Sequence, residues 1–182
     1  MKISNLIIVF ILFQTSLFAQ NIFVSNNTNI RFFSETPLEN IEAVNKDSKS
    51  LVNTKTNDIA VIIGIRNFKF EKPLMEEHFN ENYLESDKYK TSTFKGKIVS
   101  PEKFEEDGEY ELIVKGNMEI KGISKERELK GTLIKKGDSF TVKGSFQVEL
   151  KDHKIKIPKV VVANIAEVID VFVDIDYVLK TK

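Results

Sequence analysis

The chain has 182 residues, with 27 Lys plus Arg, 27 Asp plus Glu and no cysteine. This length suffices for one domain with a substantial core, and the lack of cysteine excludes both disulfides and a lipid-modified N-terminal cysteine. The balanced charge, without a long block of either sign, argues against nucleic acid as a partner and against a polybasic membrane anchor.

The first 19 residues have the features of a secretory signal peptide. Lys2 precedes the apolar run 6–13, and the small residue Ala19 marks a cleavage site. The apolar run is well short of the roughly 20 residues that span a bilayer, so we predict no retained membrane span. The sequence therefore predicts a signal peptide over residues 1–19, cleaved after Ala19, and one domain over residues 20–182 that is periplasmic or secreted.

The first part of this domain contains short strand candidates. Residues 21–25 and 29–34 flank the turn-like sequence Asn-Asn-Thr at 26–28, which predicts an opening hairpin. Residues 37–44 are compatible with one helical turn or with the entry to a third strand. Residues 51–54 are a further short strand candidate. Residues 59–65 are apolar on both faces, which predicts a strand that is covered on both sides.

A short amphipathic helix is predicted between two strands, within residues 68–96. Pro73 suits the first turn of a helix. An apolar stripe then recurs every four residues, with a second pair beside it: Met75, Phe79 and Tyr83, flanked by Leu74 and His78. A helix this short needs another surface to cover its apolar stripe. We therefore predict a helical lid that lies over the apolar interior of the β-sheet.

The second half of the domain alternates regularly between apolar and polar residues. Five runs do so, which predicts strands with one buried face: residues 91–99, 110–120, 126–134, 140–150 and 169–179. Short links make such neighbours antiparallel. Gly96, Gly116, Gly131 and Gly144 fall on the predicted inner face, which suits either sharp bending of a closing sheet or free space inside. The predicted fold class is all-β with a short helix: an antiparallel β-barrel of about eight strands, in preference to a sandwich.

Two segments resemble a known family. HFNENYLESDKYKTSTFKGKI at residues 78–98 and GEYELIVKGNMEIKGISKERELKGTL at residues 108–133 are similar to the YceI-like family of secreted, lipocalin-like barrels that bind polyisoprenoids and other long-chain amphiphiles. The positions that match the family motifs are His78, Leu84, Tyr89 and Phe94 in the first segment, and Gly116, Met118, Ile120, Gly122, Ile123 and Lys125 in the second. The chain departs from the family pattern at Lys90, Glu119 and Lys121.

The resemblance implies a lipid-binding protein that holds a long-chain isoprenoid or fatty-acyl amphiphile inside the barrel. A polar headgroup would then meet residues at the mouth such as His78, Asn80, Asn82 or Lys88. The candidate ligand-binding residues are Phe68, Phe70, Leu74, Met75, His78, Phe79, Tyr83, Phe94, Tyr110, Phe140 and Phe146. The same apolar residues also suit ordinary core packing, and Tyr110, Phe140 and Phe146 either line or fill the interior.

No enzyme motif is present in the sequence. The chain has only two histidines, His78 and His153, and it lacks a G-x-S-x-G elbow, a Walker loop and an H-E-x-x-H sequence. We therefore predict a protein that is not an enzyme and that has no catalytic residue, metal or cofactor. The alternative function is a filled barrel that binds other proteins through its surface. Residues 59–65 and 158–166, apolar on both faces, would then provide a partner or homodimer contact.

Overall fold

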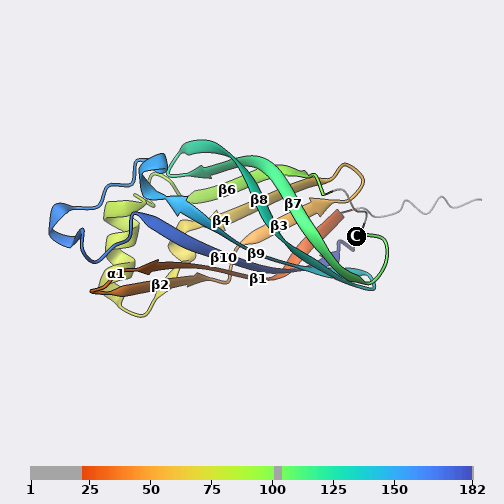
Figure 1. The fold of residues 1–182 in the computed structure, drawn as a ribbon, viewed down its shortest axis with the longest axis horizontal. Helices are drawn as coiled ribbons and strands as arrows, with labels where there is room; N and C mark the ends of the chain where they lie inside the picture. Colours follow the sequence, from red (N-terminus) through yellow and green to blue (C-terminus); the bar gives the residue numbers. More distant parts are fainter. Residues whose placement is uncertain (1–21, 101–103, 182) are drawn as a thin grey trace, which may run out of the picture.

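A computed structural model describes residues 22–100 and 104–181 (Figure 1), so the predicted signal peptide lies outside the described residues. The described chain is mostly strand. Its strands are β1 (Ile22–Glu35), β2 (Asn40–Asn45), β3 (Lys49–Asn53), β4 (Asp58–Gly64), β5 (Lys69–Phe70), β6 (Thr91–Ile98), β7 (Gly108–Ile120), β8 (Ile123–Lys136), β9 (Ser139–Glu149) and β10 (Val168–Leu179). Its helical segments are α1 (Pro73–His78), the single-turn segments η1 (Ile65–Asn67), η3 (Leu150–His153) and η4 (Lys159–Val161), and the π-helical η2 (Phe79–Tyr83).

Eight of these strands form a closed antiparallel barrel, as predicted. The hydrogen-bonded order runs β10-β9-β8-β7-β6-β4-β3-β1, and a further ladder between β1 and β10 closes the ring. The long β1 serves two neighbours, because residues 22–24 pair with β3 and residues 30–35 pair with β2. Strands β2 and β5 lie outside the ring and extend the sheet at one end of the barrel.

The predicted hairpin at residues 26–28 is wrong, because β1 runs through this region without a turn. The ladder with β10 continues from Phe23 to Phe33 and is interrupted only by a bulge at Asn26. Asn27 Nδ2 also donates to Asp176 Oδ2 at 3.3 Å. The long-range pairing therefore overrides the local turn preference of asparagine. The undecided segment 37–44 enters strand β2 after a turn in which Thr36 Oγ1 donates to the carbonyl of Glu39 at 2.9 Å.

The predicted helix is present, and its first residue is Pro73. After His78 it widens into the π-turn η2, in which the Leu84 N–H donates to the carbonyl of Phe79 at 2.9 Å. Leu84, directly after this turn, is buried in a cluster with Ile65 and Ile155, and Phe79 packs against the same cluster. Figure 1 shows α1 at the left end of the barrel, together with the β1–β2 turn and the segment between β9 and β10. We call this end the mouth.

Glycines lie opposite each other in two ladders of the barrel. Gly96 lies opposite Gly116 in the β6–β7 ladder, and Gly131 lies opposite Gly144 in the β8–β9 ladder. A Cβ atom at Gly116 would lie 2.3 Å from the carbonyl oxygen of Lys95, which no real side chain tolerates. The sequence predicted that these inner-face glycines serve either sharp bending of the sheet or free space inside. The first use, with close approach of bent strands, applies to the Gly96–Gly116 pair.

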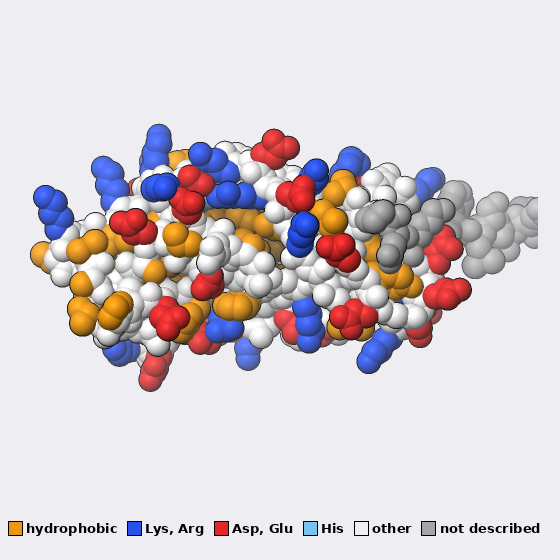
Figure 2. Space-filling view, viewed as in Figure 1, with side chains coloured by type: hydrophobic (Ala, Val, Ile, Leu, Met, Phe, Trp, Pro, Cys, Tyr) orange, Lys and Arg blue, Asp and Glu red, His pale blue; other side chains and the backbone are white. Residues whose placement is uncertain are grey.

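The wall of the barrel is split between β8 and β9 on the mouth side. Their ladder stops at Gly131 and Gly144, so residues 123–130 of β8 pair only with β7, and residues 145–149 of β9 pair only with β10. Figure 2 shows hydrophobic side chains at the base of a hollow midway along this face. Towards the mouth, η3 covers the split: Arg127 Nη2 lies 2.7 Å from Asp152 Oδ2, and His153 Nδ1 lies 3.1 Å from the carbonyl of Ile123.

The end opposite the mouth is filled by aromatic side chains. The ring of Phe140 stacks on Tyr177 at 4.7 Å and packs against Phe23 at 4.9 Å. Because Ser50 Oγ donates to the carbonyl of Ala60, the Tyr177 hydroxyl donates to Ser50 Oγ, at 2.6 Å. Burial raises the pKa of Tyr177 to about 12, although its hydrogen bond to Ser50 lowers this pKa by a smaller amount. We call Phe23, Phe140 and Tyr177 the aromatic floor.

The buried phenol predicts a loss of stability at alkaline pH. Tyrosine in the unfolded chain ionises near pH 10, whereas Tyr177 in the folded chain stays neutral to about pH 12. Ionisation therefore favours the unfolded state above pH 10, by about 2 kcal/mol at pH 11.5. The free energy of unfolding is measured with urea for the wild type and for Tyr177→Phe from pH 8 to 11.5. Plotted against pH, the two values should converge or cross as the pH rises. A constant difference between the two proteins would contradict this assignment.

Candidate functional site

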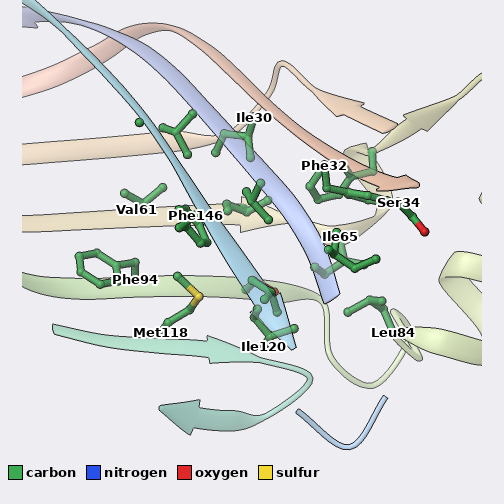
Figure 3. Close-up of a pocket in the computed structure, with 18 of the residues that line it drawn as sticks. Ile30, Phe32, Ser34, Val61, Ile65, Leu84, Phe94, Met118, Ile120 and Phe146 are labelled. Atoms are coloured by element: carbon green, nitrogen blue, oxygen red, sulfur yellow. The ribbon is translucent and has the colours of Figure 1, made fainter. Parts of the chain in front are cut away.

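A cavity of about 410 Å³ occupies the mouth half of the barrel, between α1 and the aromatic floor. Figure 3 shows side chains from β1, β4, β6, β7 and β9 converging on it. These side chains occupy inward positions of the strands, which alternate with outward ones. Representative apolar residues of its wall are Ile30, Val61, Phe94, Met118, Ile120 and Phe146.

Four phenylalanines form one side of the mouth. The ring of Phe32 lies 5.2 Å from Phe68, 5.6 Å from Phe70 and 5.4 Å from Phe79, measured between centroids. Phe79 also contacts Phe70 at 5.1 Å and Phe68 at 5.6 Å. The cluster joins β1, the short strand β5 and the helical segment, so the helix is fixed to the barrel by aromatic packing. All four rings also line the cavity.

Glu39 connects the other segments of the mouth. Its carboxylate accepts from Lys72 Nζ at 2.7 Å and from Asn164 Nδ2 at 3.3 Å. These contacts join the β1–β2 turn, the start of α1 and the segment between η4 and β10. The hydrogen bond from Lys72 holds the pKa of Glu39 below its usual range, so the carboxylate is charged at neutral pH. Glu39, Asn164 and His78 are polar residues of the cavity lining that lie at the mouth.

The structure places eight of the eleven candidate binding residues in the cavity wall: Phe68, Phe70, Met75, His78, Phe79, Tyr83, Phe94 and Phe146. Leu74 is 60 % exposed on the outer side of α1. Tyr110 packs against Phe104 at the opposite end, and its hydroxyl donates to the carbonyl of Glu106. Phe140 belongs to the aromatic floor, below the cavity. Alternation identifies an inward position but not its height along the barrel, which explains why Tyr110 and Phe140 fall outside the cavity.

Other polar residues named for a headgroup contribute less to the cavity. Asn80 Nδ2 donates to the carbonyl of Glu76 at 2.8 Å, within the helix. Lys88 lies over the ring of Tyr89, and Asn82 is exposed. Of these residues, His78 alone lines the cavity.

Several wall residues were not among the candidates, and Phe32 is the most central of them. The sequence signal for Phe32 was its place in an alternating series, because Ile30, Phe32 and Ser34 all point inward from β1. Val171 and Met118 carried the same signal in their own strands. Only the closure of the ring shows that these strands face the helix across one space.

The cavity wall is mainly apolar. In the described part of the chain, no three His, Asp or Glu side chains are grouped closely enough to hold a metal ion. His153 is fully buried outside the cavity lining, and burial lowers its pKa against the opposing effect of the carbonyls of Ile123 and Ile120. Among the described residues, no helix is long and apolar enough to cross a membrane.

Comparison with solved structures shows the same fold in other proteins. A polyisoprenoid-binding domain from Saccharophagus degradans, implicated in plant cell wall breakdown, matches with a TM-score of 0.75 at 9 % identity, over 87 % of this chain and 98 % of that one. BcnA from Burkholderia cenocepacia matches with a TM-score of 0.69 at 15 % identity, over 82 % and 95 %. The YceI protein of Campylobacter jejuni matches with a TM-score of 0.59 at 15 % identity, over 74 % and 82 %.

Sequence comparison gives the family directly. No curated protein matches the chain. The model of the YceI-like domain matches residues 23–177, which include nearly all the strands of the barrel. This match confirms the resemblance found in residues 78–98 and 108–133. The chain therefore belongs to the YceI-like domain family.

Proposed function

We propose that this protein binds a long-chain amphiphile, a polyisoprenoid or a fatty-acyl lipid, with the chain inside the barrel. The observation that carries the proposal is the apolar cavity between the mouth and the aromatic floor. Each methylene group moved from water into such a space contributes about 0.8 kcal/mol. A cavity of this kind therefore binds a hydrocarbon chain without needing many specific contacts.

The dimensions and the family support this choice of ligand. The volume of about 410 Å³ falls within the range of roughly 300–1,000 Å³ typical of small-molecule sites. The related fold from Saccharophagus degradans is described as a polyisoprenoid-binding domain. Because the far end is filled by Phe23, Phe140 and Tyr177, the chain would enter with its apolar end first. Its polar end would remain at the mouth, near Glu39, His78 and Asn164.

The site supports a carrier or sequestering role rather than catalysis. His78 is the one histidine that lines the cavity within the described chain, and no second titratable group is bonded to it there. We further propose that residues 1–19 are a cleaved signal peptide and that the protein works in the periplasm or outside the cell. The alternative of a completely filled barrel agrees with the aromatic floor but not with the open space above it.

Native mass spectrometry is the direct test of the proposal. The protein purified from its own cell envelope should carry a prenyl or acyl species in stoichiometric amount, which lipid extraction would identify. A bare protein mass that stays unchanged after incubation with undecaprenyl phosphate and with palmitate would contradict the proposed function.

A substitution that fills the cavity should reduce binding without unfolding the barrel. Val61 lines the cavity from β4, whereas its neighbour Ile62 is 48 % exposed on the outer face. Val61→Trp should displace about two methylene groups of a bound chain, which lowers its affinity by about tenfold or more. Ile62→Trp is the matched control and should leave affinity unchanged. Equal palmitate affinity of both variants, each with a wild-type circular dichroism spectrum, would place the ligand elsewhere.

A charged substitution in the helix should show whether the helix acts as a lid or is part of the hydrophobic core. Met75 lines the cavity from α1, whereas Asn82 is exposed on the following turn. Met75→Asp should weaken palmitate binding about tenfold, because the carboxylate is desolvated or displaces the helix, while the urea midpoint changes little. Asn82→Asp adds the same charge and should change neither value. Parallel losses of binding and stability in Met75→Asp would make the helix part of the core.

A further inference from the structure

The mouth exposes large hydrophobic side chains that the rest of the described surface does not match. Leu38, Leu74, Val160 and Val162 are 68 %, 60 %, 90 % and 54 % exposed, whereas the next most exposed, Ile62, reaches 48 %. A soluble surface tolerates single apolar residues, but several at one end of a molecule indicate an interaction site. Figure 2 shows hydrophobic and basic side chains side by side at this left end.

These four residues come from three segments that are joined to one another. Leu38 lies in the β1–β2 turn, Leu74 in the first turn of α1, and the two valines in or next to η4. Glu39 bonds to Lys72 and to Asn164, one residue in each of the other two segments. The apolar residues therefore form one surface, which we call the mouth rim: Leu38, Leu74, Val160 and Val162.

The mouth rim is continuous with the interior. Val161 and Ile165 line the cavity, while Val160 and Val162, on either side of Val161, face outward. An apolar path thus leads from the cavity wall to the outer tip of the same segment. A hydrocarbon chain that leaves the cavity along this path would remain in contact with apolar side chains as far as the mouth rim.

The charge next to Val160 and Val162 is basic, whereas the exposed Glu35, Glu71 and Glu77 lie near Leu38 and Leu74 in the sequence. Residues 153–166 contain Lys154, Lys156 and Lys159 but no acidic residue. All three lysines are exposed, and none forms an ion pair with another residue in the described ranges 22–100 and 104–181. A second copy that met this segment with its own segment 153–166 would bring the same three cations together, which disfavours that contact. An anionic lipid bilayer offers an apolar interior for the exposed valines and negative charge for the unpaired lysines.

We propose that the mouth rim docks onto an anionic lipid bilayer, with Val160 and Val162 in the headgroup region and the three lysines against lipid phosphates. The inference rests on the proposed function in one respect: docking would place the cavity opening at the membrane from which an amphiphile is taken. Leu38 and Leu74 would contact the surface on the other side of the opening.

The absence of tryptophan makes a direct test available, because Val160→Trp creates the only tryptophan in the chain. The test uses the chain starting at Gln20, which holds every described residue, and vesicles of phosphatidylcholine with 30 % phosphatidylglycerol. The emission of Val160→Trp should shift to shorter wavelength when these vesicles are added. Val99→Trp is the matched control, since Val99 is 44 % exposed at the opposite end and should not respond. No shift in Val160→Trp, or an equal shift in Val99→Trp, would overturn docking at the mouth.

Charge substitutions and a measurement of molecular mass distinguish a bilayer from other binding partners. In co-sedimentation with the same vesicles, replacing Lys154, Lys156 and Lys159 by Gln should lower the partition coefficient by about fivefold per lysine. Val160→Asp should lower it at least tenfold, and Val99→Asp should leave it unchanged. Equal binding to uncharged phosphatidylcholine vesicles would refute the basic contact. A shift that appears without vesicles, together with a dimer mass in light scattering, would identify a second copy of the chain as the occupant instead.

A separate measurement distinguishes failure of this inference from failure of the proposed function. Palmitate binding is measured without vesicles, where Val160→Asp should keep wild-type affinity because its side chain faces away from the cavity. Normal palmitate binding without vesicle binding would refute the docking alone. Vesicle binding without palmitate binding would refute the proposed function and leave the mouth rim as a membrane contact.

Discussion

The ladder between β1 and β10 is the constraint on which the rest of the structure depends. It pairs Phe23 with Leu179 at one end and Phe33 with Asp170 at the other, and it turns an open sheet into a ring. Closure gives each strand position a fixed inward or outward direction. The interior exists because this ladder holds, and it is also why β1 cannot form the hairpin that its asparagines favour.

The interior has two parts that differ in how completely side chains fill them. Towards the floor, Phe23, Phe140 and Tyr177 fill the cross-section. Towards the mouth, aliphatic residues such as Val61 and Val171 leave space, and the helix and Phe32 partly cover it. The tightly packed floor thus supports a less filled region above it. Binding cavities commonly lie beside a rigid, well-packed part of the fold in this way.

Much of this arrangement follows from the sequence, but not all of it. Alternation in β7 to β10 gave the strands and their inward faces, and Pro73 with its apolar stripe gave the helix. The height of a residue along the barrel could not be predicted, because Phe140 and Phe146 share one face and one strand yet belong to the floor and to the cavity. The role of Phe32 depended on contacts with Phe68 and Phe79, far away in sequence. Local patterns do not contain such pairings.

The split between β8 and β9 gives the wall of the cavity a mechanical property that a fully paired barrel lacks. Past Gly131 and Gly144, no backbone ladder joins the two strands, and side-chain contacts of η3 cover the opening. The circumference at this height can therefore increase by displacement of side chains, with every ladder kept. For the ligand proposed above, a wall with such a seam would adapt its width to a straight acyl chain or to the methyl branches of an isoprenoid, and the closed frame would be kept.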